Sequence, residues 1–492
     1  MKSRYLNIFR LVSHCVFIAV HLFIADISSL SAQQRPQLVS ENQLVAHIRK
    51  IVGESNIGGK IGIAVADTRS ERMVFTHNGE LPLNPASNMK LLTAAAALWE
   101  LGSDFRMQTA LYGNVQGESV VGGLYLKGYG DPTLRWSDLV SLARELAARG
   151  IGNVDEVVVD GGYFDTQMLP PSFEQQPDEE SPFRAAIGAV SIDRNAYVLY
   201  VRPGLKAGSP ARFSLDIPGY FEVENELVTS EGEGPKVVAI QNPKGDKLRL
   251  RLQGTVPLGV SYLSYSRRVV NPLSYAGYAM VEALRSVRIK VARRIRLATT
   301  PTGVALLASR RSIALSEILR ALGKYSDNFV AEMVFKVLGA ERRRIPGRSS
   351  DGAIVVREMV KRLAIPSEKL LVVNGSGLYE GNRVAAAHIA KLLVAAHNDT
   401  AIRAEYLSHL AIAGVDGTLS NRLPDLPAPR IVYAKTGTLK SVTALSGYVL
   451  GPMPERVFTF SFIANEIAGK HQKAKTLADD IVTSIASFLW RR

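Results

Sequence analysis

The sequence is organised around the stretch Ala86-Ser87-Asn88-Met89-Lys90-Leu91-Leu92-Thr93-Ala94, which opens an apolar, alanine-rich run ending at Leu101. The run predicts a buried helix, and helical residues three apart lie on one face. Lys90 is therefore expected one turn above Ser87, within reach of its hydroxyl. A serine becomes a strong nucleophile when a base removes its proton, and a desolvated lysine can be that base. By itself, such a pair is more often a capping serine and an exposed lysine.

Two later stretches supply the other parts of a serine acyl-transfer site. Ser326-Asp327-Asn328 stands before a helical run, and Lys435-Thr436-Gly437-Thr438 is predicted to end a strand and enter a loop. The ordered motifs S-x-x-K, S-x-N and K-T-G are typical of penicilloyl serine transferases, in which the first serine is acylated. Each motif is weak alone, whereas the ordered set is specific. Asp327 is grouped with the substrate-binding residues.

The residue types of the first two motifs fit the steps of acyl transfer. Ser87 is the expected nucleophile and Lys90 its general base. Ser326 can relay a proton to the leaving amine, and the Asn328 amide can hold a backbone group of the substrate. The backbone N–H groups of Ser87 and Thr438 are the expected oxyanion hole.

The third motif is expected to bind the substrate carboxylate. Lys435 is predicted to be a fixed positive charge that attracts this carboxylate and keeps Lys90 neutral. The hydroxyls of Thr436 and Thr438 can donate to the same carboxylate. Gly437 carries no side chain, so a substrate backbone can approach the strand closely.

These motifs resemble those of D-alanyl-D-alanine carboxypeptidases/endopeptidases, the class C low-molecular-mass penicillin-binding proteins. The resemblance covers nearly all of the chain after its N-terminal segment and includes residues 130–134, 413–419 and 443–449. Ser87 and Ser326 are 239 positions apart (326 − 87), and this family carries two extra domains in that gap. The resemblance implies an α+β fold, a penicillin-binding domain whose antiparallel sheet is flanked by helices, with two nested, β-rich inserted domains.

Boundaries follow from the resemblance and from the change in pattern along the chain. The catalytic domain is placed at 33–104 and 301–492, the first inserted domain at 105–117 and 188–300, and the nested one at 118–187. Short strand-like runs predominate between 105 and 300, with an amphipathic helix at 137–149 and a long loop at 162–183. Further helices are expected at 33–55, 313–322, 328–338, 351–363, 384–396 and 477–490.

One stretch departs from the family pattern. The family's Asp-Gly-Ser-Gly-Leu-Ser is replaced by Asn374-Gly375-Ser376-Gly377-Leu378-Tyr379. Asparagine can take the place of aspartate in a turn. Since the charge is lost, a catalytic use of this loop is left open.

The N-terminal segment has the layout of a secretory signal peptide. Lys2, Arg4 and Arg10 flank or precede the apolar run 11–25, and small residues follow at 28–32. We expect cleavage after residues 1–32 and export to the periplasm; a retained membrane anchor is the alternative. The single cysteine, Cys15, lies in this segment, so the mature chain needs neither disulfides nor metal–thiolate chemistry.

Charge and histidine placement bear on partners and cofactors. The formal net charge is +14, but the basic clusters are dispersed rather than set beside aromatic residues, which argues against nucleic acid. An anionic envelope polymer, a membrane surface contacted peripherally, or simply a solvated basic surface fits this charge. The histidines show no metal-ligand spacing, and no cofactor or metal is expected.

The resemblance implies a penicillin-sensitive serine-type D-Ala-D-Ala carboxypeptidase that works through an acyl-enzyme on Ser87 and remodels the cell wall. It also implies endopeptidase activity on peptidoglycan cross-links, with stem peptides as substrates and β-lactams as covalent inhibitors. Two alternatives remain: a β-lactamase of the same superfamily and a catalytically silent wall-binding protein. A β-lactamase needs a deacylating group, and the sequence contains neither a Glu-x-x-Leu-Asn loop nor a Tyr-x-Asn motif.

Overall fold

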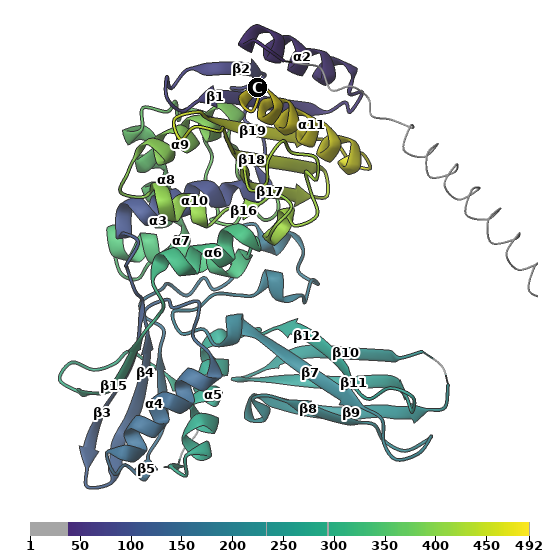
Figure 1. Ribbon diagram of the computed structural model, residues 1–492. Coiled ribbons are helices and arrows are strands. Elements are labelled where there is room, and N and C mark those ends of the chain that lie inside the picture. The colour runs from purple at the N-terminus through teal and green to yellow at the C-terminus, as the bar shows by residue number, and fades with distance from the viewer. Residues whose placement is uncertain (1–37, 233, 293–294, 492) are drawn as a thin grey trace, which may run out of the picture.

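The structure, a computed structural model, describes residues 38–491 apart from 233 and 293–294. The predicted signal peptide at 1–32 lies outside these residues. Figure 1 shows a sheet-and-helix unit that contains the C-terminus, with two elongated β-rich units on its opposite side. Among the described helices, none is both long enough and apolar enough to cross a bilayer.

A six-stranded antiparallel sheet forms the framework of the first unit. Its strand order is β16-β17-β18-β19-β1-β2. The strands are β1 (Lys60–Asp67), β2 (Met73–His77), β16 (Ala411–Ile412), β17 (Val432–Leu439), β18 (Val442–Leu450) and β19 (Val457–Asn465). Along β18, Leu445 and Val449 enter one hydrophobic core, whereas Ala444 and Tyr448 enter another. Because both faces are covered, β18 and β19 are buried almost throughout.

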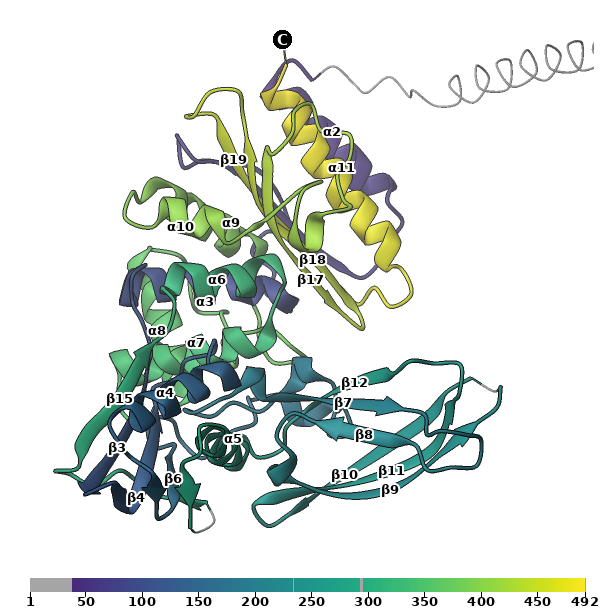
Figure 2. The ribbon, with the colours of Figure 1, turned by 60° about the horizontal axis from the view of Figure 1, so that its bottom comes forward.

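Helices cover the two faces of this sheet. On one face lie α2 (Glu41–Glu54) and α11 (His471–Leu489), side by side in Figure 2. The other face carries α3 (Met89–Leu101), α6 (Leu315–Lys324), α7 (Asn328–Arg342), α8 (Ser349–Arg362), α9 (Ala386–Asn398) and α10 (Arg403–Ser408). Helix α3 is central in this layer, and each residue from Met89 to Leu98 is buried, as the apolar run predicted.

The first β-rich unit is a seven-stranded sheet packed against two helices. The strands are β3 (Gln108–Gln116), β4 (Ser119–Gly128), β5 (Asn153–Val154), β6 (Val157–Asp160), β13 (Lys290–Val291), β14 (Arg296–Leu297) and β15 (Ala305–Arg311). The helices are α4 (Trp136–Ala148) and α5 (Pro272–Ser286). Helix α5 was not anticipated, although Asn271 caps it and Pro272 occupies its first turn, two ordinary start signals.

The second β-rich unit consists of two three-stranded sheets, ordered β12-β7-β8 and β10-β11-β9 (Figure 2). The strands are β7 (Ala196–Arg202), β8 (Arg212–Leu215), β9 (Phe221–Ser230), β10 (Lys236–Lys244), β11 (Lys247–Pro257) and β12 (Leu263–Arg268). Side chains of both β-rich units share one hydrophobic core. The shared core joins the two units into a single packed body.

The strand pairing corrects the predicted boundaries of the inserted domains. The division between 117 and 118 falls inside a hairpin, because Gln116 of β3 pairs with Ser119 of β4. The strands of the two other sheets span 196–268, whereas the predicted nested domain at 118–187 contains β4, β5 and β6 of the first sheet. The boundary at 300 is also too early, since β15 pairs with β3. The prediction failed because β3 and β15 were not recognised as strands.

Candidate active site

Ser87 lies on a single 3₁₀ turn, Ala86–Asn88, that leads into α3. The turn is tightly fixed. Asn84 Oδ1 accepts the Ala86 N–H at 2.9 Å, and the Asn465 side chain bonds both the N–H and the carbonyl of Asn84 at 2.8 and 3.0 Å. Ala86 itself adopts a left-handed backbone with φ 47°. Such strain in a non-glycine residue persists where the surroundings over-determine it, often at functional sites.

Lys90 occupies the position that its spacing predicted. Its fully buried Nζ lies 3.1 Å from Ser87 Oγ, 2.7 Å from Asn328 Oδ1 and 2.7 Å from the Ser376 carbonyl. Burial lowers the pKa of Lys90 from 10.5 to about 7, against the opposing effect of the Glu332 and Asp327 carboxylates. A large fraction of Lys90 is therefore neutral near pH 7, as a general base requires. Desolvation is the main cause of the lowered pKa of Lys90, and not the charge of Lys435 that the sequence predicted to be the cause.

The second motif lies where α7 begins. Asp327 caps the helix by accepting the Val330 N–H at 3.0 Å, and it pairs with Arg194 of the inserted region at 2.8 Å. Asn328 accepts from Lys90 through Oδ1 and donates through Nδ2 to the Phe183 carbonyl at 3.2 Å. Ser326 sits on the preceding turn with a left-handed backbone, φ 60°. Of Ser326, Asp327 and Asn328, Asn328 is the residue that is hydrogen-bonded to Lys90.

The third motif lies inside β17 and not at its end, which corrects the sequence-based expectation. Lys435 is fully buried and donates to the Thr436 carbonyl at 2.8 Å. Burial, followed by repulsion from Lys90, lowers the pKa of Lys435 well below its usual value. The Thr436 hydroxyl donates to Thr418 Oγ1 at 2.8 Å. The lowered pKa opposes the fixed positive charge that the sequence predicted for Lys435.

Gly437 and Thr438 bring β17 against the turn that carries Ser87. A Cβ added at Gly437 would lie 3.0 Å from the Pro85 carbonyl oxygen and 3.1 Å from Ala86 Cβ. Thr438 is exposed on the same strand. Strand β16 pairs with β17 only at Tyr433 and Ala434 within the described part of the chain. Beyond that point, the edge of β17 is open to an extended substrate backbone.

Contacts of Glu332 orient the Ser376 carbonyl, which accepts a hydrogen bond from Lys90. Glu332, on α7, accepts the N–H groups of Gly375 and Ser376 at 3.2 and 2.7 Å. These bonds hold the loop so that the Ser376 carbonyl faces Lys90. Burial raises the pKa of the Glu332 carboxyl, and this rise is partly offset by hydrogen bonding with the Ser376 side chain, by the two backbone N–H groups and by Lys90.

The loop that departs from the family pattern is held together by Asn374. Its Oδ1 accepts the Gly377 N–H and the Asn382 amide, each at 2.9 Å. Its Nδ2 donates to the carbonyls of Pro171 and Leu378 at 3.0 and 3.2 Å. A carboxylate has no donor for these two carbonyls. Within this loop, the asparagine therefore meets a requirement that aspartate would not.

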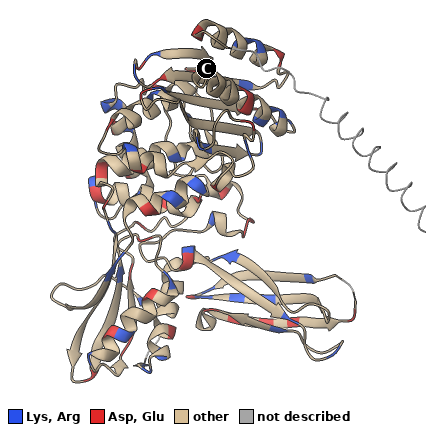
Figure 3. Ribbon diagram, viewed as in Figure 1, with Lys and Arg blue, Asp and Glu red and all other residues tan. Residues whose placement is uncertain are grey.

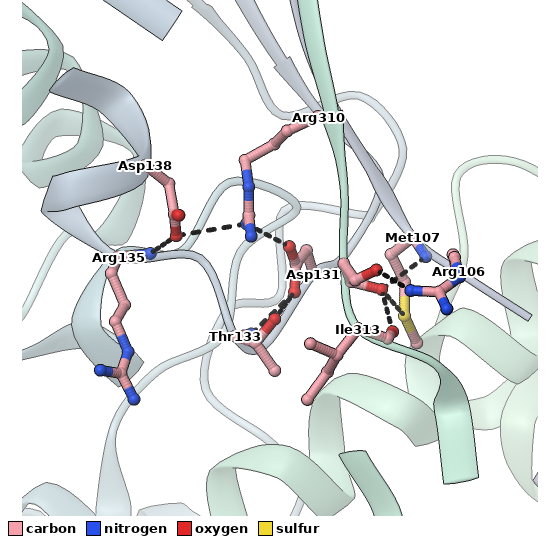
Figure 4. A network of polar contacts seen from close by, with 9 residues as sticks. Arg106, Met107, Asp131, Thr133, Arg135, Asp138, Arg310 and Ile313 are labelled. Carbon is pink, nitrogen blue, oxygen red and sulfur yellow. Dashed lines mark hydrogen bonds and ion pairs between the residues drawn. The ribbon is translucent and has the colours of Figure 1, made fainter. Parts of the chain in front are cut away.

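The family-like stretch 130–134 belongs to a separate polar network, shown in Figure 4. Asp131 is buried; it pairs with Arg310 of β15 at 2.9 Å and accepts from Thr133. Arg310 also lies 3.3 Å from Asp138 at the start of α4. These contacts tie the inserted sheet to the chain that leads back to α6. This network therefore serves to hold the fold together.

The chain is similar to proteins of a known family. A model of the D-Ala-D-Ala carboxypeptidase 3 (S13) family matches residues 44–487. The chain belongs to this family. The S13 assignment confirms the resemblance drawn from the three motifs.

Two relatives and one solved structure are similar to this chain over most of its length. A D-alanyl-D-alanine carboxypeptidase from Actinomadura sp. (strain R39) is 34% identical over 88% of this chain and 82% of its own. The D-alanyl-D-alanine carboxypeptidase DacB from Haemophilus influenzae is 27% identical over 82% and 85%. The crystal structure of penicillin binding protein 4 from Haemophilus influenzae covers 89% of this chain and 99% of its own, with 23% identity and a TM-score of 0.76. This similarity confirms the α+β fold class.

Sequence reasoning missed two side chains of this S13 site, Glu332 and Thr418. Thr418 lies in the stretch 413–419 that had been noted only for its resemblance. For Glu332, a signal was present: Asn328, Glu332 and Lys336 recur every four residues in the otherwise apolar start of α7. Polar residues at this spacing form one stripe on a helix, and a buried polar stripe needs partners.

Proposed function

We propose that this chain is a penicillin-sensitive, serine-type D-Ala-D-Ala carboxypeptidase that acts through an acyl-enzyme on Ser87. The observation that carries the proposal is the 3.1 Å contact of a buried Lys90, with its pKa near 7, to Ser87 Oγ. Neutral Lys90 takes the Ser87 proton as Oγ attacks the carbonyl of the penultimate D-alanine. The amide bond then breaks, the terminal D-alanine leaves as an amine protonated by way of Ser326, and water later hydrolyses the ester.

The remaining assigned residues position the substrate. We propose that the substrate backbone lies along the open edge of β17, with its terminal carboxylate bound by Lys435, Thr436 and Thr438. The carboxylate would raise the pKa of Lys435 and so favour its charged form. The N–H groups of Ser87 and Thr438 would stabilise the oxyanion. Asn328 would orient both Lys90 and the substrate. Asp327 would contribute to substrate binding from the start of α7.

Endopeptidase activity is the same acyl transfer with a larger leaving group. In a peptidoglycan cross-link, the amine of a diaminopimelate residue would replace the terminal D-alanine. The open strand edge beyond Ala434 supports this extension, because it leaves room for a chain that continues past the scissile bond. Such cleavage would make the enzyme a cell-wall remodelling protein. A crystal structure of the Haemophilus influenzae penicillin binding protein 4 holds a novel β-lactam, which supports β-lactams as inhibitors here.

We also propose where the protein acts and how its insertion is divided. The segment 1–32 would direct export to the periplasm. The strand pairings favour one inserted domain at about 105–195 and 269–311, with a nested domain at about 196–268. Lys and Arg are spread over all parts of the molecule in Figure 3, which fits diffuse contact with an anionic envelope rather than one basic site.

The test compares Ser87→Ala with Ser420→Ala, an exposed serine outside the site. Ser87→Ala should abolish labelling by fluorescent penicillin and the release of D-alanine from purified muropeptides, read by mass spectrometry. Ser420→Ala should leave both unchanged. Loss of alanine from monomers and splitting of dimers would be scored separately. Labelling or release that survives Ser87→Ala would overturn the assignment, and rapid penicillin turnover would favour the β-lactamase.

A further inference from the structure

A cavity of about 670 Å³, whose lining includes none of the three motifs, lies between the long loop 162–183 and the start of α8. Thr166 and Gln167 line its loop side, and Arg348, Ser349, Ser350 and Arg357 line its helix side. This volume is in the range of small-molecule sites. The reaction proposed above makes no use of these side chains.

The helix side of the cavity carries uncompensated positive charge. Within the described residues, Arg348 and Arg357 form no ion pair or side-chain hydrogen bond. Nearby arginines differ: Arg343 pairs with Glu358, and Arg344 pairs with Asp351. Acidic partners are thus available in this region, but they are taken by other residues.

The one carboxylate that lines the cavity, within the described part of the chain, is already neutralised. Asp165 Oδ1 lies 2.5 Å from the buried Nζ of Lys336, which also donates to the Gln167 carbonyl at 2.8 Å. The charge left in the cavity is therefore that of the two guanidinium groups.

The N-terminus of α8 adds to this positive field. The helix runs for 14 residues from Ser349 to Arg362, and no side chain caps it at Arg348. The first N–H groups of a helix have no partner within the helix, and its dipole places partial positive charge there. Asp351 lies in the first turn but is held by Arg344 and does not line the cavity.

Ser349 places a free hydroxyl at the wall of the cavity. The residue is only 5% exposed and lines the cavity, and its hydroxyl has no hydrogen-bond partner among the described residues. Its Oγ is not among the fully enclosed side-chain atoms that lack a partner, so it is open towards the cavity. It can therefore donate to a molecule bound there.

We propose that this cavity binds a phosphate group. Two guanidinium groups, two serine hydroxyls and a helix N-terminus match its several oxygens and its double charge better than they match a carboxylate. The volume leaves room for an organic substituent on the phosphate. The lining residue Val373 directly precedes Asn374, so the cavity and the loop that orients the Ser376 carbonyl share one segment. The site goes beyond the proposed peptidase activity and does not depend on it.

Calorimetric titration of the mature chain at low ionic strength tests this site. The probes are inorganic phosphate, glycerol 1-phosphate and acetate, with phosphatidylglycerol vesicles as a separate arm. We expect both phosphates to bind and acetate to bind more weakly. Arg357→Gln should weaken phosphate binding by about tenfold or more, since it removes a charge-assisted contact. Ser349→Ala should weaken it less, and Lys361→Gln, the same charge change at the far end of α8, should have no effect.

The outcomes separate this site from the peptidase. Fluorescent-penicillin labelling measured on each variant should be unchanged, so loss of phosphate binding with intact labelling supports the cavity. Ser87→Ala should bind phosphate normally. The proposal is overturned if neither phosphate binds the original chain, if Arg357→Gln and Lys361→Gln behave alike, or if vesicles alone bind.

Discussion

At the scale of single residues, the proposed reaction depends on Lys90, and the titration of its amine makes that reaction measurable. Because the base must be neutral, the acylation rate should rise with pH through an inflection near 7, the pKa that burial gives Lys90. The measurement is the second-order rate constant for labelling by a penicillin between about pH 5.5 and 9. A flat profile would contradict the assignment of Lys90 as base.

Asp327→Asn tests the same assignment without removing the base. The Asp327 carboxylate raises the pKa of Lys90, so its loss should move the inflection to lower pH. Asparagine caps helices about as well as aspartate, so α7 should still start normally. An inflection that stays in place would mean that another group titrates.

Asn374 offers a second prediction at this scale. Asn374→Asp removes the donors to the carbonyls of Pro171 and Leu378 and buries a carboxyl beside them. We expect the free energy of unfolding to fall by about 3 kcal/mol at pH 7. The buried carboxyl should have a raised pKa, so the folded state binds more protons than the unfolded state above about pH 4. The loss should therefore shrink as the pH falls towards that value.

Urea unfolding of this variant beside Asn114→Asp, at an exposed position of β3, separates burial from charge. Equal losses in the two variants would show that the hydrogen bonds of Asn374 do not matter.

The sequence predicted the contact between Lys90 and Ser87 but not the physical cause of the lowered pKa of Lys90. The contact between Lys90 and Ser87 follows from helical spacing, so local sequence was sufficient. The lowered pKa of Lys90 comes from burial beneath segments distant in sequence. Ser376 acts through its backbone carbonyl, which any residue type provides, so no side-chain pattern marks it.

Helix α7 organises the site at the scale of elements. Asn328, Glu332 and Lys336 lie on one stripe; they hold Lys90, the N–H groups of Gly375 and Ser376, and the long loop, respectively. One helix therefore contacts the proposed base, the loop whose carbonyl accepts from it and the nearest part of the insertion. The spacing was visible in the sequence, but the partners of Glu332 and Lys336 are set by tertiary packing.

The fit between this loop and the turn that carries Ser87 gives a prediction for elements. Gly377 has φ 76°, and a Cβ there would lie 1.9 Å from the Ala86 carbonyl oxygen. Gly377→Ala should lower the free energy of unfolding by about 3 kcal/mol, from backbone strain plus the forced shift. Acylation should slow as well, because the shift displaces the turn.

Gly414→Ala is the matched control, since Gly414 has φ 66° with nothing within 4 Å of the added atom. It should cost about 1 kcal/mol of stability and leave acylation unchanged. Equal effects of the two substitutions would mean that left-handed strain, and not the contact with Ala86, explains the loss.

At the scale of the whole molecule, the sequence predicted an insertion but not its internal division. The length of the insertion and its strand-like runs could be predicted from the sequence. The pairing of β15 with β3, however, joins residues almost 200 positions apart (305 − 113 = 192). No local pattern specifies such a partner. Likewise, the long loop 162–183 was expected, but its position against α7 follows only from contacts such as that of Phe183 with Asn328.

The pair of Lys336 and Asp165 tests how strongly the insertion is fixed to the catalytic unit. Lys336 Nζ is buried and bonds Asp165 at 2.5 Å and the Gln167 carbonyl at 2.8 Å. Lys336→Met should lower the free energy of unfolding by about 3 kcal/mol, because it leaves Asp165 without its counter-charge. In a double-mutant cycle, adding Asp165→Asn should cost less in the Lys336→Met background than alone, with a coupling of about 1 to 3 kcal/mol. Additive losses would mean that the insertion is held by other contacts, and that α7 orients Asn328 and Glu332 without it.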